Sequence, residues 1–108
     1  MSFDMNKLMQ QAAEMQQQMQ KLQEEAAAEV AEASVGGGMV KVTANGAGDV
    51  LSIVISPEAI DPADPEALGD LVLAGVNEAL RAARGALESK AQQMVNDLGL
   101  GDLGLPGA

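Results

Sequence analysis

Several residue types that carry chemistry are missing from this sequence. Its 108 residues include no Cys, His, Trp or Tyr and a single Phe. Without Cys there is no disulfide scaffold, thiol nucleophile or iron–sulfur cluster. Without His there is no ordinary general base and no imidazole metal ligand. We therefore expect a protein that is not an enzyme and that holds no cofactor and no metal ion.

Long apolar runs and positive charge are also scarce. No uninterrupted apolar stretch approaches the roughly 18 to 20 residues that span a bilayer, and the first residues lack the basic and apolar regions of a signal peptide. We expect a cytoplasmic protein with no membrane contact. Lys and Arg number 6 against 16 Asp and Glu, which gives a net charge of −10. This acidity at first disfavours a nucleic-acid partner, because phosphate repels a negative surface.

A helical repeat occupies the N-terminal part. Residues 4–28 contain neither Pro nor Gly, and apolar residues recur there at spacings of three and four. This apolar stripe consists of Met5, Leu8, Ala12, Met15, Met19, Leu22 and Ala26. The pattern predicts a helix that packs on another helix. Its methionines would also suit an adaptable recognition surface.

Residues 39–55 change to a period of two. Strands over 39–44 and 50–55 are predicted on either side of residues 45–49, whose Asn45-Gly46 dipeptide readily takes positive φ angles, as in a β-hairpin. One face carries Val40, Val42, Leu51, Ile53 and Ile55, and the opposite face carries Met39, Val50 and Val54. Since the opposite face is more apolar than a solvated face should be, we expect Met39, Val50 and Val54 at the interface of a sheet-mediated homodimer. Residues 29–35 fit either an extension of the helix or a short first strand.

A second long helix follows the hairpin. Asp64 is a suitable N-cap, Pro65 suits the first helical position, and helical spacing continues to about Leu98. The fold class is therefore α+β, with one domain over residues 1–98 and a flexible tail over 99–108. Helices of about 37 and 50 Å exceed a compact globule of about 35 Å. We expect them to project as arms, with the start of the first beside the end of the second.

Charge is distributed unevenly along the chain. Residues 24–78 hold eleven acids and only Lys41, whereas residues 1–23 are neutral and residues 79–97 are faintly positive. The arms therefore offer the surface best suited to phosphate. The candidate DNA-contacting residues are Lys7, Gln10, Gln11, Gln18, Lys21, Arg81, Arg84 and Lys90. An ordinary solvated helix face explains these residues nearly as well.

Two motifs elsewhere are better explained by structure. Residues 99–104 match G-x-G-x-x-G, but a dinucleotide site needs a strand before the motif and a helix after it. Asp61, Asp64 and Glu66 could suggest calcium binding, yet the adjacent prolines and the missing loop pattern favour helix capping.

Several short segments, in order, carry a family resemblance. They are residues 5–12 (MNKLMQQA), 36–43 (GGGMVKVT) with Asn45-Gly46 close behind, 55–58 (ISPE), 68–72 (LGDLV), 74–79 (AGVNEA) and 101–107 (GDLGLPG). Together they resemble the YbaB/EbfC family of bacterial nucleoid-associated proteins. The resemblance implies a homodimer with a central antiparallel sheet and helical arms set like tweezers. It also implies binding of double-stranded DNA with little sequence specificity, in the nucleoid, with effects on nucleoid organisation or gene expression.

Two functional hypotheses follow. In the first, the dimer grips the DNA backbone through its arms. In the second, a non-enzymatic adaptor dimer keeps the fold, has lost DNA binding because of its acidity, and binds a protein partner such as a replication or recombination protein. Binding to random-sequence DNA that weakens steeply with salt would favour the first hypothesis.

Overall fold

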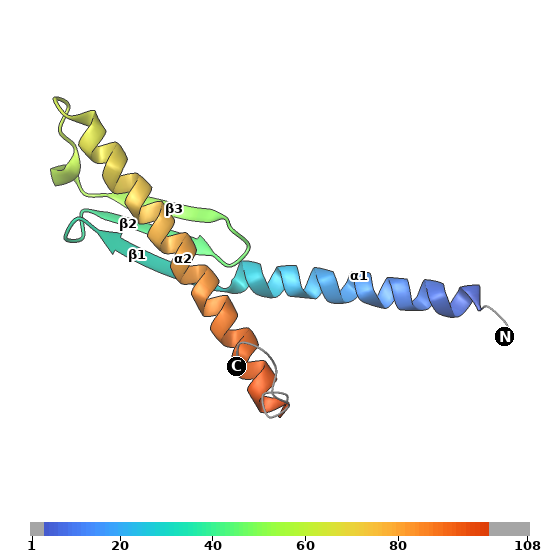
Figure 1. The fold of residues 1–108 in the computed structure, drawn as a ribbon. Helices are drawn as coiled ribbons and strands as arrows, with labels where there is room; N and C mark the ends of the chain where they lie inside the picture. The colour runs from blue at the N-terminus through green and yellow to red at the C-terminus, as the bar shows by residue number, and fades with distance from the viewer. Residues whose placement is uncertain (1–3, 100–108) are drawn as a thin grey trace.

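A computed structural model describes residues 4–99 and has the expected α+β architecture (Figure 1). Along the chain, helix α1 (Met5–Ala28) is followed by strands β1 (Val30–Val35), β2 (Val40–Asn45) and β3 (Val50–Ile55). A short 3-10 helix, η1 (Pro57–Ala59), then leads to the long helix α2 (Pro65–Asp97). Within residues 4–99, no helix combines the length and apolar character that crossing a membrane requires. Apart from Gly99, the predicted tail over 99–108 lies outside the described residues.

Both helices begin at a capping aspartate, and the cap at Asp64 is the one that the sequence predicts. The Asp4 carboxylate accepts hydrogen bonds from the backbone N–H groups of Asn6 and Lys7, at 3.1 and 3.3 Å. The Asp64 carboxylate accepts one from the N–H of Ala67 at 3.2 Å, with Pro65 at the first helical position. These caps satisfy N–H groups that have no partner inside the helix.

The three strands form one antiparallel sheet in the order β1-β2-β3. The ambiguous residues 29–35 are a strand over most of their length, because β1 pairs with β2 from Val30 opposite Asn45 to Val35 opposite Val40. Between β1 and β2, all three glycines of the 36–38 turn have positive φ angles of 63°, 67° and 92°. Side chains rarely adopt that conformation, so the triple glycine makes the turn possible.

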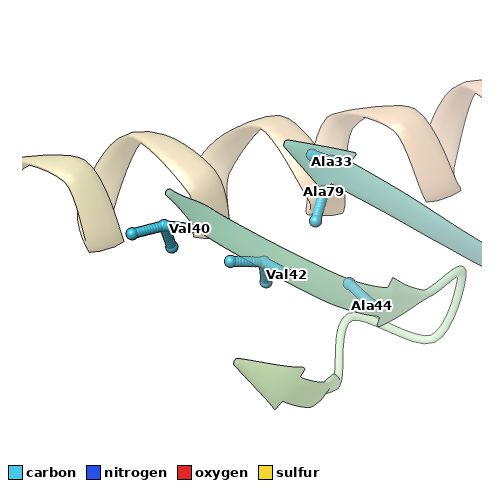
Figure 2. Packing of buried hydrophobic residues seen from close by; sticks show 5 residues of the cluster. All are labelled: Ala33, Val40, Val42, Ala44 and Ala79. Atoms are coloured by element: carbon cyan, nitrogen blue, oxygen red, sulfur yellow. The ribbon is translucent and has the colours of Figure 1, made fainter. Parts of the chain in front are cut away.

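Helix α2 crosses one face of the sheet and forms a thin core. Gly75, Ala79 and Ala83 are its buried residues, and their small size lets the helix backbone lie close to the strands. The buried cluster joins Ala79 to Ala33, Val40, Val42 and Ala44 of the sheet (Figure 2). A helix about 10 Å wide covers about two strands spaced 4.8 Å apart. Accordingly, α2 packs mainly on β1 and β2 and leaves β3 largely uncovered.

Strand β3 differs from the prediction in its register. The pairing shifts between Thr43 and Ala44, so Val50 lies opposite Ala44, a residue of the covered face, while Val54 lies opposite Lys41. The prediction that Val50 and Val54 share one face is therefore wrong. A bulge changes the side on which residues lie, and strict alternation cannot reveal it.

The two helices diverge instead of meeting at their far ends. Figure 1 shows α1 continuing beyond one end of the sheet, while α2 crosses the strands obliquely and points elsewhere. The expectation that the start of α1 lies beside the end of α2 is wrong, because α2 spends much of its length on the sheet. The chain is nonetheless elongated, measuring 75 × 33 × 18 Å.

Candidate nucleic-acid interface

Helix α1 presents a continuous polar surface to solvent. At about 100° per residue, the five DNA-contact candidates of α1 fall on one side of the helix, away from the apolar stripe. We call this surface the α1 polar stripe; it consists of Lys7, Gln10, Gln11, Gln18 and Lys21, all exposed. Lys7 and Lys21 are 14 residues apart, which corresponds to about 21 Å along the helix. The structure thus brings these five candidates together.

The α1 polar stripe keeps its cations available. Among the described residues there are two ion pairs, Arg81 with Glu78 and Lys90 with Glu29, and neither uses a lysine of α1. Glu14 lies between the two lysines on the same side of the helix, and with Asp4 it balances their charge. The partial positive charge of the helix N-terminus faces the Asp4 carboxylate that caps α1.

The basic residues of α2 lie elsewhere. Arg81 and Arg84 are exposed, yet Ala79 and Ala83 close to them in sequence are buried against the sheet. Both arginines therefore sit on the outer side of α2 above the sheet, and not on a projecting arm as the sequence suggested. Arg81 also pairs with Glu78 at 3.2 Å, although such an exposed pair contributes little to stability.

Lys90 lies at a third location, where α2 passes the end of α1. Its Nζ is 3.5 Å from Oε2 of Glu29. Beside it, a groove of about 280 Å³ separates the two helices and is lined by Leu22, Glu25, Leu87, Lys90, Ala91 and Met94. The eight DNA-contact candidates thus fall into three separate groups within one chain.

Exposed apolar residues gather on β3 and on α1. The interface candidates Met39, Val50 and Val54 are all exposed, but so are Leu51 and Ile53 of β3, which the sequence placed on the buried face. Their exposure follows from the width of a single helix, which cannot cover a third strand. On α1 no residue is buried, and only the end of the apolar stripe, at Leu22 and the half-buried Ala26, lies near another element of the described chain.

In the acidic segment before α2, the aspartates accept hydrogen bonds from nearby backbone N–H groups. Asp61 accepts a hydrogen bond from the N–H of Ala63 at 2.9 Å, and Asp64 caps α2. These contacts match the capping role predicted for the segment. Among residues 4–99, no group of three or more acidic side chains is arranged to hold a metal ion.

Comparison with known proteins identifies the relatives of this fold. The sequence model of the YbaB/EbfC DNA-binding family matches residues 1–98. The chain belongs to that family. A nucleoid-associated protein of Pelotomaculum thermopropionicum is 45% identical over 98 residues, covering 91% of this chain and 93% of the relative. One from Chloroflexus aurantiacus is 46% identical over 96 residues, covering 89% and 96%.

A solved structure supports the fold of this YbaB/EbfC member independently. The crystal structure of an uncharacterized protein from Helicobacter pylori superposes with a TM-score of 0.64 at 23% identity. The match covers 87% of this chain and 99% of the other. At this level of identity the similarity establishes the architecture of two long helices and a three-stranded sheet.

Proposed function

We propose that this chain binds double-stranded DNA as a homodimer, through the α1 polar stripe and with little sequence specificity. The observation that carries the proposal is the free-standing helix α1, which has no buried residue and gathers five polar candidates on one side. Membership of a DNA-binding family supports the same ligand. Relatives named as nucleoid-associated proteins support a site of action at the nucleoid, in the cytoplasm, with effects on its organisation or on gene expression.

The contacts we propose are mainly with the DNA backbone. Lys7 and Lys21 would pair with phosphates about 21 Å apart, and Gln10, Gln11 and Gln18 would donate N–H groups to phosphate or base edges. Such contacts position the protein but carry little sequence information. The acidic middle of the chain would keep the duplex away from the sheet, which confines binding to the arms.

The homodimer would form along β3. Among residues 4–99 this strand is an edge of the sheet, with no strand paired to its outer side, and it carries neither Lys nor Pro. Natural edge strands usually carry such residues to prevent pairing with another chain. We propose Met39, Val50 and Val54 as interface residues, with two copies doubling the number of α1 polar stripes.

Titration of a labelled random-sequence duplex, followed by anisotropy at several salt concentrations, tests the DNA proposal. We expect affinity to fall steeply with salt, and replacing Lys7 and Lys21 by Gln should reduce the slope of log affinity against log salt by about 0.9 for each lost phosphate contact. Replacing Arg81 and Arg84 by Gln provides the comparison, because these arginines lie above the sheet. A slope that depends on the arginines and not on the lysines would contradict the assignment to α1.

The unpartnered apolar stripe of α1 favours a second candidate, the adaptor that binds a protein. Absence of DNA binding at 50 mM salt and tens of micromolar protein would make this candidate the leading one. Recovery of the same replication or recombination protein after nuclease treatment, and its loss in a Met15→Glu/Met19→Glu variant, would then support it.

A further inference from the structure

Helix α1 is attached to the rest of the molecule over a small area. Its end meets the β2–β3 turn, where the N–H of Gly46 donates to the carbonyl of Glu29 at 2.9 Å. Glu29 is the C-cap of α1, and its own N–H donates to the carbonyl of Ala26 at 3.2 Å. On the other side, Glu29 pairs with Lys90 of α2. We call Ala26, Glu29, Gly46, Leu87 and Lys90 the α1 joint.

Gly46 determines how closely the parts of the α1 joint approach one another. A Cβ at this position would lie 2.9 Å from the carbonyl oxygen of Ala26 and 3.1 Å from Cδ2 of Leu87. Gly46 is not among the glycines with positive φ, so space and not backbone conformation requires glycine here. Because the carbonyl oxygen belongs to the last turn of α1, relieving this contact requires the end of α1 and the β2–β3 turn to move apart.

Beyond the α1 joint the two helices do not pack against each other. The groove of about 280 Å³ lies between them, and Leu22 and Met94 on its walls are 63% and 56% exposed. Of the two ion pairs among the described residues, only Lys90–Glu29 links the end of α1 to α2. The direction of α1 therefore depends on the backbone contacts at Gly46 and on this ion pair.

We propose that Gly46 and the Lys90–Glu29 pair are positioning elements that set the direction of α1 relative to the sheet. Lys90 then acts on DNA binding by orienting the α1 polar stripe, without touching DNA. In a dimer, the direction of α1 fixes the distance between the two polar stripes and hence their match to one duplex. The consequence for DNA rests on the proposed function, whereas the orientation of α1 is measurable without DNA.

Distance measurement between spin labels tests the orientation directly. The chain has no natural cysteine, so labels at Ala13→Cys on α1 and Gln92→Cys on α2 are the only ones present. Diluting labelled chains with unlabelled protein isolates distances within one chain. We expect Gly46→Ala to shift the mean distance and Lys90→Gln to broaden the distribution. High salt should broaden the distance distribution of the unmodified protein in the same way, because salt screens an exposed ion pair.

Matched controls distinguish a change in the direction of α1 from a general loss of structure. Gly85→Ala adds a methyl group to α2 where nothing lies within 4 Å of it, and Arg81→Gln removes the other ion pair; both should leave the distances unchanged. The charge reversal Glu29→Lys with Lys90→Glu should restore the distribution that Lys90→Gln broadens. If Gly46→Ala does not fold, the Lys90 variants still show whether the α1 joint sets the direction of α1.

The DNA measurement distinguishes orientation from contact. We expect Lys90→Gln to weaken binding by up to about fivefold with an unchanged salt slope, and the charge reversal to recover the loss. Distances that stay the same in Lys90→Gln, or a salt slope reduced by about 0.9 per copy, would overturn the proposal. If the unmodified protein binds no DNA, the proposed function fails, and the label distances still decide whether the α1 joint sets the helix direction.

Discussion

At the scale of single residues, small side chains decide where α2 meets the sheet. Gly75, Ala79 and Ala83 recur every four residues and are buried. Larger residues at these positions would hold the helix away from Val40 and Val42, which are fully buried. A regular four-residue spacing of small residues is visible in the sequence, and it could have identified the contact face of the helix.

Gly75→Ala should destabilise the fold although alanine favours helix. The added Cβ would lie 2.9 Å from Cγ2 of Val42 and 3.4 Å from Cγ2 of Val35, so the core must shift, at a cost of about 1–3 kcal/mol. Gly69→Ala is the matched control, since nothing lies within 4 Å of its added Cβ; it should stabilise α2 by up to about 1 kcal/mol. Urea unfolding of both variants measures the difference, and equal effects would contradict the packing described.

Asn45 anchors the β2–β3 turn from inside the protein. It is 5% exposed, and its Oδ1 accepts hydrogen bonds from the N–H groups of Ala47 and Asp49, at 3.1 and 3.0 Å. Asn45→Ala leaves both N–H groups without this acceptor, and we expect a loss of about 1–3 kcal/mol in the free energy of unfolding. Asn77→Ala, at an exposed position of α2, should change stability little in the same thermal or urea measurement.

At the scale of elements, the sequence predicts what depends on local pattern. The cap at Asp64, the two long helices and the hairpin are local features, and all are confirmed. The expectation of positive φ angles at Asn45-Gly46 is wrong, because Asn45 ends β2 and the positive φ of the turn lies at Gly48. Whether residues 29–35 continue the helix or form a strand depends on pairing with β2, and the register at Val50 depends on a bulge. The positions of Arg81 and Arg84 depend on how far α2 lies over the sheet. None of these is encoded in a short window of sequence.

A charge on β3 should dissociate the proposed homodimer without unfolding the chain. Val54 is 62% exposed within one chain, so Val54→Lys costs the isolated fold little, whereas it would place an ammonium group in the proposed interface. We expect sedimentation equilibrium to report a dimer for the unmodified protein and a monomer for Val54→Lys. Ser34→Lys on β1, the opposite edge of the sheet, should remain dimeric. A monomeric unmodified protein would refute the interface.

At the scale of the whole molecule, one helix is too narrow to enclose the sheet. The sequence contains enough apolar residues for a larger core, yet they are divided between β3, the apolar stripe of α1 and the thin layer under α2. Fold class and family could be predicted from the sequence. The division of the DNA-contact candidates into three groups could not, because it follows from the directions in which the helices leave the sheet.

The elongated shape is itself measurable. The Cα radius of gyration of one chain is 20.6 Å, whereas a compact chain of this length would have about 13 Å. Small-angle scattering of monomeric Val54→Lys should therefore give a value near the larger figure. A value near 13 Å would show that α1 folds back on the sheet, and the α1 polar stripe would then need a different description.

The absence of buried residues on α1 has a consequence for the rates at which backbone amides exchange with solvent. Local unfolding of α1 in the isolated chain exposes almost no new surface, so the amides of α1 should exchange through local fraying. The amides of β2 should exchange only through global unfolding. A second copy or a DNA duplex that covers α1 would slow only the first group. Amide exchange along 24 residues of one helix would thus record, position by position, where a partner lies.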